Sequence, residues 1–203
     1  MTAQPRRRTT AKSNDQSYAP KEHSAPEPAL TADEHDRQAS IDRVLQRYGA
    51  DLDRLAAFDR GDLAAPAEDA ATARIDVGDV DRIVAQLRDR YPTDERFGVA
   101  KDESIHSVLL QLDQTFAGQD LYSTAQEKAA NLLYMVAKDH PFSDGNKRTA
   151  AALFAYFLDR NGIELDRAIP GNMLTALTLI AAVSDPANKD ETVTLIRSLL
   201  SSE

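Results

Sequence analysis

The residues best suited to chemistry lie close together, between positions 138 and 150, where the sequence reads KDHPFSDGNKRTA. The chain has only four histidines, and one of them, His140, precedes an aspartate, an asparagine, a lysine and an arginine in one short stretch. A turn between two helices needs a glycine and an aspartate, and no more. The additional side chains indicate a functional site.

These residue types suit phosphate binding if a helix begins near Asn146. The N–H groups in the first turn of a helix are unpaired and carry the positive end of the helix dipole, so they can bind an anion. Gly145 would let a ligand approach the backbone closely. Lys147 and Arg148 place two cations in that first turn, where positive charge disfavours the helix itself. An anion such as a phosphate chain is therefore expected there.

Two further residues supply the rest of the chemistry. Asp144 offers a hard oxygen ligand for Mg²⁺, which typically takes one or two protein carboxylates together with phosphates and waters. His140 can accept a proton because imidazole titrates near neutral pH. Phe142, between two polar positions, is expected to point into the core and to fix the loop. Together the residues predict Mg-nucleotide-dependent transfer to a hydroxyl group.

A structural interpretation accounts for the same residues. A histidine near the C-terminus of a helix is often a cap, and Asp-Gly-Asn is ordinary turn chemistry. The spacing alone does not decide between a site and a turn. It does exclude a P-loop, because the sequence has no Gly-x-x-x-x-Gly-Lys-Ser/Thr motif.

Helical periodicity predicts the two elements that position the loop. Ser123-Thr-Ala-Gln126 has the form of a capping box, and the helix that it starts runs from Thr124 to about Lys138. That helix is expected to bury Ala129, Leu132, Leu133 and Val136. The next helix begins near Asn146, ends at Asn161-Gly162, and is expected to bury Ala150, Leu153, Phe154, Phe157 and Leu158.

Five further helices are predicted, and no stretch shows the sustained alternation of a sheet. One carries Ile41, Val44, Leu45, Tyr48, Leu52 and Leu55; the second carries Val80, Ile83, Val84, Leu87 and Tyr91 and is stopped by Pro92; the third carries Ile105, Val108, Leu109, Leu112 and Phe116 and ends at Gly118. The last two span roughly 171–183 and 189–201. The stretch Arg96–Asp102 is a loop or a small hairpin, and the fold class is all-α.

Composition indicates a soluble globular protein, with 42% hydrophobic and 28% charged residues among 203. Residues 1–33 show no apolar period and are predicted to be disordered. The net charge of the chain is −9, and residues 1–30 carry +2 of it, so the remaining residues carry −11. This negative charge argues against nucleic-acid binding by the folded part. The absence of cysteine excludes disulfides. No apolar run reaches the ~20 residues that span a bilayer, so a cytoplasmic protein is expected.

The stretch His140-Pro-Phe-Ser-Asp-Gly-Asn-Lys-Arg148 resembles the signature of the Fic/Doc family, His-x-Phe-x-(Asp/Glu)-Gly-Asn-Gly-Arg-x-x-Arg. The variant with lysine at the second glycine is similar to the Doc (death-on-curing) branch. The similarity covers about residues 95 to 200. It implies a Fic/Doc helical core at 95–203 with a small flap. The helical N-terminal extension at 34–94 and the disordered tail at 1–33 are predicted from periodicity and composition.

The resemblance also implies roles for individual residues. His140 would be the general base for a target hydroxyl, Asp144 would hold Mg²⁺, and Phe142 would be structural. The nucleotide-binding residues would be Ser143, Gly145, Asn146, Lys147 and Arg148. Family members use Mg-ATP to transfer AMP, another phosphate-containing group or a phosphoryl group to Ser, Thr or Tyr of a protein target. Phe97–Glu103 corresponds to the family's flap.

Two departures from the signature bear on the chemistry. Lys147 replaces the second glycine, and Ala151 replaces the final arginine. Both favour Doc-like phosphoryl transfer. The first alternative is AMP transfer by the same site, and the second is a catalytically silent adaptor that binds nucleotide or a partner. The inhibitory motif (Ser/Thr)-x-x-x-Glu-(Gly/Asn) is matched only in part, by Ser123 and Glu127 followed by Lys128. Any restraint of the enzyme is therefore expected from an inhibitory partner chain.

Overall fold

The structure is a computed structural model that describes residues 31–63, 68–91, 95–169 and 171–200. The chain divides into two units, residues 1–48 and residues 49–203. Most of the predicted disordered tail, up to residue 30, lies outside the described residues. Within the described ranges, no helix is both long enough and apolar enough to cross a membrane.

Helix α1, Ala32–Asp59, begins in the first unit and ends in the second. Its start is fixed by Thr31 and Glu34: the Glu34 N–H donates to Thr31 Oγ1 at 3.3 Å, and the Thr31 N–H donates to Glu34 Oε2 at 2.6 Å. The predicted apolar stripe lies on this helix, but its side chains are 44–62% exposed: Ile41, Val44, Leu45, Tyr48, Leu52 and Leu55. Periodicity therefore predicted the helix correctly without predicting burial.

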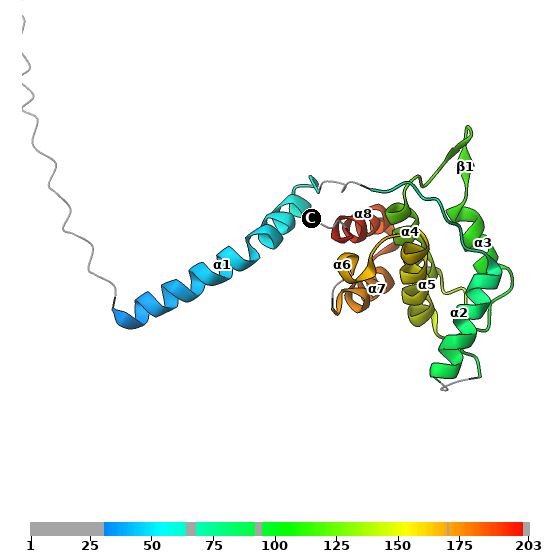
Figure 1. Ribbon diagram of the computed structural model, residues 1–203, viewed down its shortest axis with the longest axis horizontal. Helices are drawn as coiled ribbons and strands as arrows, with labels where there is room; N and C mark the ends of the chain where they lie inside the picture. The colour runs from blue at the N-terminus through cyan, green and yellow to red at the C-terminus, as the bar shows by residue number, and fades with distance from the viewer. Residues whose placement is uncertain (1–30, 64–67, 92–94, 170, 201–203) are drawn as a thin grey trace, which may run out of the picture. The chain divides into compact units, whose positions relative to one another are not determined.

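The second unit is built around two central helices, α4 (Ala125–Asp139) and α5 (Asn146–Arg160), which pack against each other. Figure 1 shows this pair between α2 and α3 on one side and α7 and α8 on the other. The flanking elements are α2 (Val77–Arg90), α3 (Ser104–Leu112), α6 (Leu165–Ala168), α7 (Met173–Val183), a 3₁₀ turn (Pro186–Asn188) and α8 (Lys189–Leu199). The predicted all-α class is confirmed.

Helix α4 is the centre of the core, because every residue from 125 to 137 except Glu127 is buried. The predicted apolar faces of α4 and α5 are buried as well. The start of α4 differs from the prediction by one residue. Thr124, with extended φ −112° and ψ 157°, is the N-cap instead of Ser123, and its Oγ1 accepts from the Glu127 N–H at 3.1 Å. Glu127 in turn accepts from the Ser123 N–H at 3.0 Å.

The prediction was wrong in extending the third helix to Phe116. Helix α3 ends at Leu112, and a hairpin follows, with strands β1 (Thr115–Phe116) and β2 (Gln119–Asp120) paired antiparallel. Ala117 and Gly118 both have positive φ, 51° and 82°, as a two-residue turn of type I′ requires. The side chain of Phe116 is 80% exposed on this hairpin. The alternative hairpin site, Arg96–Asp102, forms no hairpin of its own.

A buried lysine holds the base of the hairpin against α4. Lys128 is 1% exposed, and its Nζ lies 3.1 Å from Asp113 Oδ1 and 2.9 Å from Asp120 Oδ2. A buried ammonium needs such partners, because removing it from water without them is costly. Lys128 therefore ties both ends of the hairpin to the central helix.

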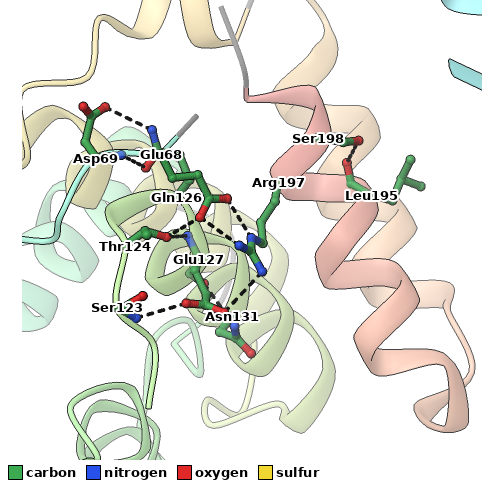
Figure 2. A network of polar contacts seen from close by, with 10 residues as sticks. All are labelled: Glu68, Asp69, Ser123, Thr124, Gln126, Glu127, Asn131, Leu195, Arg197 and Ser198. Atoms are coloured by element: carbon green, nitrogen blue, oxygen red, sulfur yellow. Dashed lines mark hydrogen bonds and ion pairs between the residues drawn. The ribbon is translucent and has the colours of Figure 1, made fainter. Parts of the chain in front are cut away.

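A second polar cluster holds the N-terminal end of α4, as Figure 2 shows. Arg197 of α8 donates from Nε and Nη2 to the two carboxylate oxygens of Glu68, at 2.7 and 2.8 Å, and from Nη1 to Glu127 at 3.2 Å. The Thr124 hydroxyl donates to Glu68 Oε2 at 2.6 Å. This bidentate arrangement is the stronger kind of arginine–carboxylate pair. It joins the segment before α2 to α4 and α8.

Gln126 extends the same cluster toward Asp69. The Asp69 N–H donates to Gln126 Oε1 at 3.0 Å, and Gln126 Nε2 donates to Asp69 Oδ2 at 3.1 Å. The Ala125 N–H donates to the Asp69 carbonyl at 2.8 Å. Two of the first N–H groups at the start of α4 (those of Ala125 and Glu127) thus have partners, as a buried helix end requires.

Candidate active site

The residues predicted to do chemistry lie on the loop that joins α4 to α5. Helix α4 ends at Asp139, and its C-cap His140 has left-handed backbone angles (φ 51°, ψ 58°); α5 begins after Gly145, which has φ 84°. These two positions turn the chain sharply enough to return it along α4. As a result His140 and the N-terminus of α5 face one small region.

The loop is locked internally by Asn146. Its Oδ1 accepts from the Phe142 N–H at 2.9 Å, and its Nδ2 donates to the Phe142 carbonyl at 2.8 Å. The Phe142 side chain is 2% exposed and belongs to the core. Each polar atom of the Asn146 amide therefore has a partner within the loop, so the side chain acts first as a structural brace for the loop.

The stretch between α2 and α3 packs along the loop and fixes it from outside. It makes isolated bridges at Phe97 with Asp144 and at Ala100 with Phe142. Three backbone hydrogen bonds accompany them: Gly98 N–H to Asp144 O at 3.0 Å, Ser143 N–H to Val99 O at 2.8 Å, and Lys101 N–H to Pro141 O at 2.8 Å. The loop is thus held on two sides before any ligand binds.

A cavity of about 390 Å³ opens at this place, and its lining residues are Lys101, His140, Ser143, Asp144, Gly145, Asn146, Lys147 and Arg148. The structure therefore brings together every predicted site residue except Phe142, which lies beneath the loop. The lining holds three cationic side chains against one carboxylate, a charge balance that favours an anionic ligand.

Lys101 is the lining residue that sequence reasoning missed. It comes from Phe97–Glu103, the segment that the motif resemblance predicts to be a flap, but neither its type nor its spacing marked it as part of the site. Its backbone bond to Pro141 places it opposite the N-terminus of α5. Lys101 reaches the site through tertiary contacts, and because 39 positions separate it from His140, no local sequence pattern links the two residues.

Asp144 and Arg148 face each other loosely within the site. Asp144 Oδ2 lies 3.6 Å from Arg148 Nη2, and the two side chains are 43% and 38% exposed. An ion pair with this spacing and exposure contributes little. Both groups thus stay available to a ligand.

The donor set is compatible with Mg²⁺ bound together with phosphate. Among the described residues, no group of three His, Cys, Asp or Glu side chains could hold a metal ion without other ligands. Asp144 would be the protein ligand, and phosphates and waters would complete the octahedron that Mg²⁺ prefers. When bound, the ion would neutralise charge on the phosphate groups.

The end of α4 carries a second acidic group next to the loop. Burial raises the pKa of Asp139 above its ordinary value, although the neighbouring charges of Lys189 and His140 act in the opposite direction. Lys189 also lies over the ring of Tyr134, 5.8 Å from its centroid. Asp139 does not line the cavity, so its effect on His140 would be electrostatic.

Two comparisons with known proteins agree with this geometry. Residues 74–158 match the model of the Fic/DOC family. The chain is also similar to a protein named Toxin Doc from Mycolicibacterium smegmatis, with 47% identity over 51 residues, which are 25% of this chain and 39% of that toxin. No solved structure matches the chain. The resemblance predicted from the loop motif is thus confirmed.

Proposed function

Taking residues 74–158 as a Fic/Doc segment, we propose that the chain transfers a phosphoryl group from Mg-ATP to a Ser, Thr or Tyr hydroxyl of a protein target. One observation carries the proposal. A histidine, a carboxylate and the cationic N-terminus of a buried helix line a single cavity of about 390 Å³. That combination can position a triphosphate and remove a proton from an attacking hydroxyl.

Each lining residue has a role in this reaction. His140 takes the proton of the target hydroxyl as the new O–P bond forms to the γ-phosphorus, and the bond from that phosphorus to the bridging oxygen breaks to release ADP. Asp144 holds Mg²⁺. The backbone N–H groups at Gly145 and Asn146, with Ser143, surround phosphate oxygens. Lys147 and Arg148 balance charge on the transferred group and the leaving group.

Phosphoryl transfer is favoured over AMP transfer by two positions on α5. Lys147 lies in the first turn, where a glycine would leave more room, and its side chain lines the cavity. Ala151 lies four residues later on the same helix and offers no second guanidinium for the phosphate chain. The similarity to a protein named Toxin Doc supports the same choice.

The biological setting that we propose follows from the same relative. A protein named as a toxin needs restraint, and the chain matches the inhibitory motif only at Ser123 and Glu127, both of which are engaged at the start of α4. We therefore place the restraint on a separate inhibitory chain. A target bearing a hydroxyl acceptor and a cytoplasmic location complete the proposal.

The test uses ATP labelled separately at the α and γ phosphates. The full chain is incubated with Mg²⁺, each labelled ATP and a desalted bacterial lysate. His140→Asn serves as the background control for kinases of the lysate, because asparagine tolerates the left-handed backbone at this position. We expect a protein band that takes γ label, takes no α label and is absent with the variant. A band labelled from the α position would show AMP transfer instead, and the absence of any His140-dependent band would favour a silent adaptor.

A further inference from the structure

Phe97 lies beneath the candidate active site, although it is not among the residues that line the cavity. Its side chain is 0% exposed, and it comes from the stretch between α2 and α3. Arg88 of α2 holds its carbonyl oxygen with two hydrogen bonds, from Nε at 3.2 Å and from Nη2 at 2.7 Å. The position of Phe97 is therefore fixed by the scaffold before any ligand binds.

The ring of Phe97 touches the N-terminus of α5 at two places. A Cβ atom added to Gly145 would lie 2.4 Å from Phe97 Cε2, so the ring rests directly against the glycine backbone. Because Gly145 also has φ 84°, no other residue would be accommodated there without strain. One turn later, the guanidinium carbon of Arg148 lies 4.5 Å from the centroid of the same ring.

Stacking on a ring has a consequence for the guanidinium that an ion pair would not have. The five N–H donors of arginine lie in the plane of the group, whereas stacking uses its face. A guanidinium held over Phe97 thus keeps its donors free for phosphate oxygens. The contact with Asp144, at 3.6 Å and partly exposed, is too weak to fix the side chain by itself. The ring of Tyr91 also lies near the guanidinium, but its centroid is 5.6 Å from the guanidinium carbon, farther than that of Phe97.

We propose that Phe97 is a positioning residue for the transfer reaction: its ring orients the Arg148 guanidinium toward the bound phosphates. The effect on ATP binding rests on the proposed function, whereas the stacking itself does not. Phe97 thereby connects α2, through Arg88, to the phosphate-binding end of α5.

The experiment compares Phe97→Leu with a matched control. Leucine keeps an apolar group in the core but removes the aromatic face. Phe157→Leu makes the same change at a residue of α5 that is 1% exposed and lies far along the helix from the loop. Affinity for Mg-ATP is measured by calorimetry for the wild type, both leucine variants, Arg148→Ala and the double variant Phe97→Leu/Arg148→Ala, together with melting temperatures.

We expect Phe97→Leu to weaken ATP binding about fivefold, which is the range of a cation–π contact. Phe157→Leu should lower the melting temperature to a similar extent with unchanged ATP affinity. On the Arg148→Ala background, Phe97→Leu should cause little further loss, because the residue on which it acts is absent. Independent, multiplying effects of the two substitutions, or an equal loss in Phe157→Leu, would show a purely structural role and overturn the proposal.

A second measurement needs no ATP. Protons above an aromatic face resonate upfield, so the Arg148 Nε–H resonance of the wild type, assigned with Arg148→Ala, should be displaced upfield of the other arginines. An unshifted resonance would contradict the stacking on Phe97, and so would a displacement that persisted in Phe97→Leu, because it would come from the Tyr91 ring. If the wild type bound no ATP while this resonance was displaced and the displacement was lost in Phe97→Leu, the proposed function would be wrong, and the placement of Arg148 by Phe97 would still hold.

Discussion

The two ends of helix α4 differ in how their charges are used. At the N-terminal end, Arg197 makes three hydrogen bonds to two carboxylates, and the Glu68 side chain is only 5% exposed. At the C-terminal end, the helix leads into a loop with three cations around one cavity. Within the described part of the chain, neither Lys101 nor Lys147 forms an ion pair.

This difference separates stabilising charges from functional ones. A buried, fully bonded pair costs stability when one partner is removed, because the other charge is left without compensation. Exposed and unpaired charges contribute little to folding, and like charges placed together oppose it. The loop keeps its cations close together at a helix N-terminus, where the dipole also disfavours them. Such an arrangement is expected where an anionic ligand completes the site.

The largest effect is expected at the C-terminal end of α4, which leads into the candidate active site, from His140→Asn. We expect the rate of transfer to fall about a thousandfold, because general base catalysis typically contributes factors of this size. The melting temperature should stay unchanged, since asparagine readily adopts the left-handed conformation (φ 51°) that His140 has. Initial rates with γ-labelled ATP and thermal melts measure the two quantities. A variant that retained the full rate would remove His140 from the reaction.

The second effect is expected at the other end of the helix, from Arg197→Met. The substitution leaves the carboxylate of Glu68 buried without its cation, so we expect a loss of about 3 kcal/mol in the free energy of unfolding. Transfer activity at a temperature where the variant is folded should be retained, because Arg197 does not line the cavity. Urea unfolding followed by circular dichroism gives the stability.

Arg148→Met, an arginine-to-methionine change in the first turn of α5, just after the loop at the C-terminal end of α4, is the matched control for Arg197→Met. Arg148 is 38% exposed and makes one ion pair, at 3.6 Å, and methionine can keep an apolar contact with the Phe97 ring. Arg148→Met should therefore change stability by no more than about 0.5 kcal/mol and should weaken ATP binding about tenfold or more. If the two variants lost equal stability, the distinction between the two ends of α4 would be wrong.

The sequence predicts the loop and its flanking helices well because their signals are local. The glycine and the hydroxyl cap stand next to the helices that they bound, and the apolar spacing of α5 lies within the element itself. The hairpin was missed for the opposite reason. Phe116 lies four residues after Leu112, which is helical spacing. Ala117 has a positive φ of 51°, which an alanine in the sequence does not predict.

The groups that support the site could not be predicted, because their partners are distant along the chain. Arg197 and Glu68 are separated by 129 residues. Lys101 and Phe97 are brought to the loop by backbone pairing of their segment with Pro141 and Asp144. A sequence motif identifies only those site residues that lie next to one another in the chain. The residues that hold the motif in place come from packing, and a single sequence gives no direct sign of which segments pack together.

The smallest of the expected effects is a pH dependence of stability that arises from the Glu68–Arg197 pair at the N-terminal end of α4. Burial raises the pKa of Glu68, but the hydrogen bonds from Arg197 and Thr124 and the charge of Arg197 outweigh it and bring the pKa below the ordinary 4.5. The folded state then binds fewer protons than the unfolded state, so this carboxylate stabilises the protein above pH 4.5 and the contribution is lost as the pH falls through the folded-state pKa.

Comparison of the wild type with Glu68→Gln isolates this contribution. Glutamine keeps an oxygen for Thr124 and Arg197 but has no charge to titrate. We expect the variant to melt a few degrees lower than the wild type at pH 7 and the difference to narrow as the pH is lowered below 4.5. Asp139, whose raised pKa gives the opposite slope, is unchanged in both proteins and cancels in the difference. A gap in melting temperature that stayed constant across this range would mean that the Glu68 charge adds nothing, and that the N-terminal end of α4 is held by shape and neutral hydrogen bonds alone.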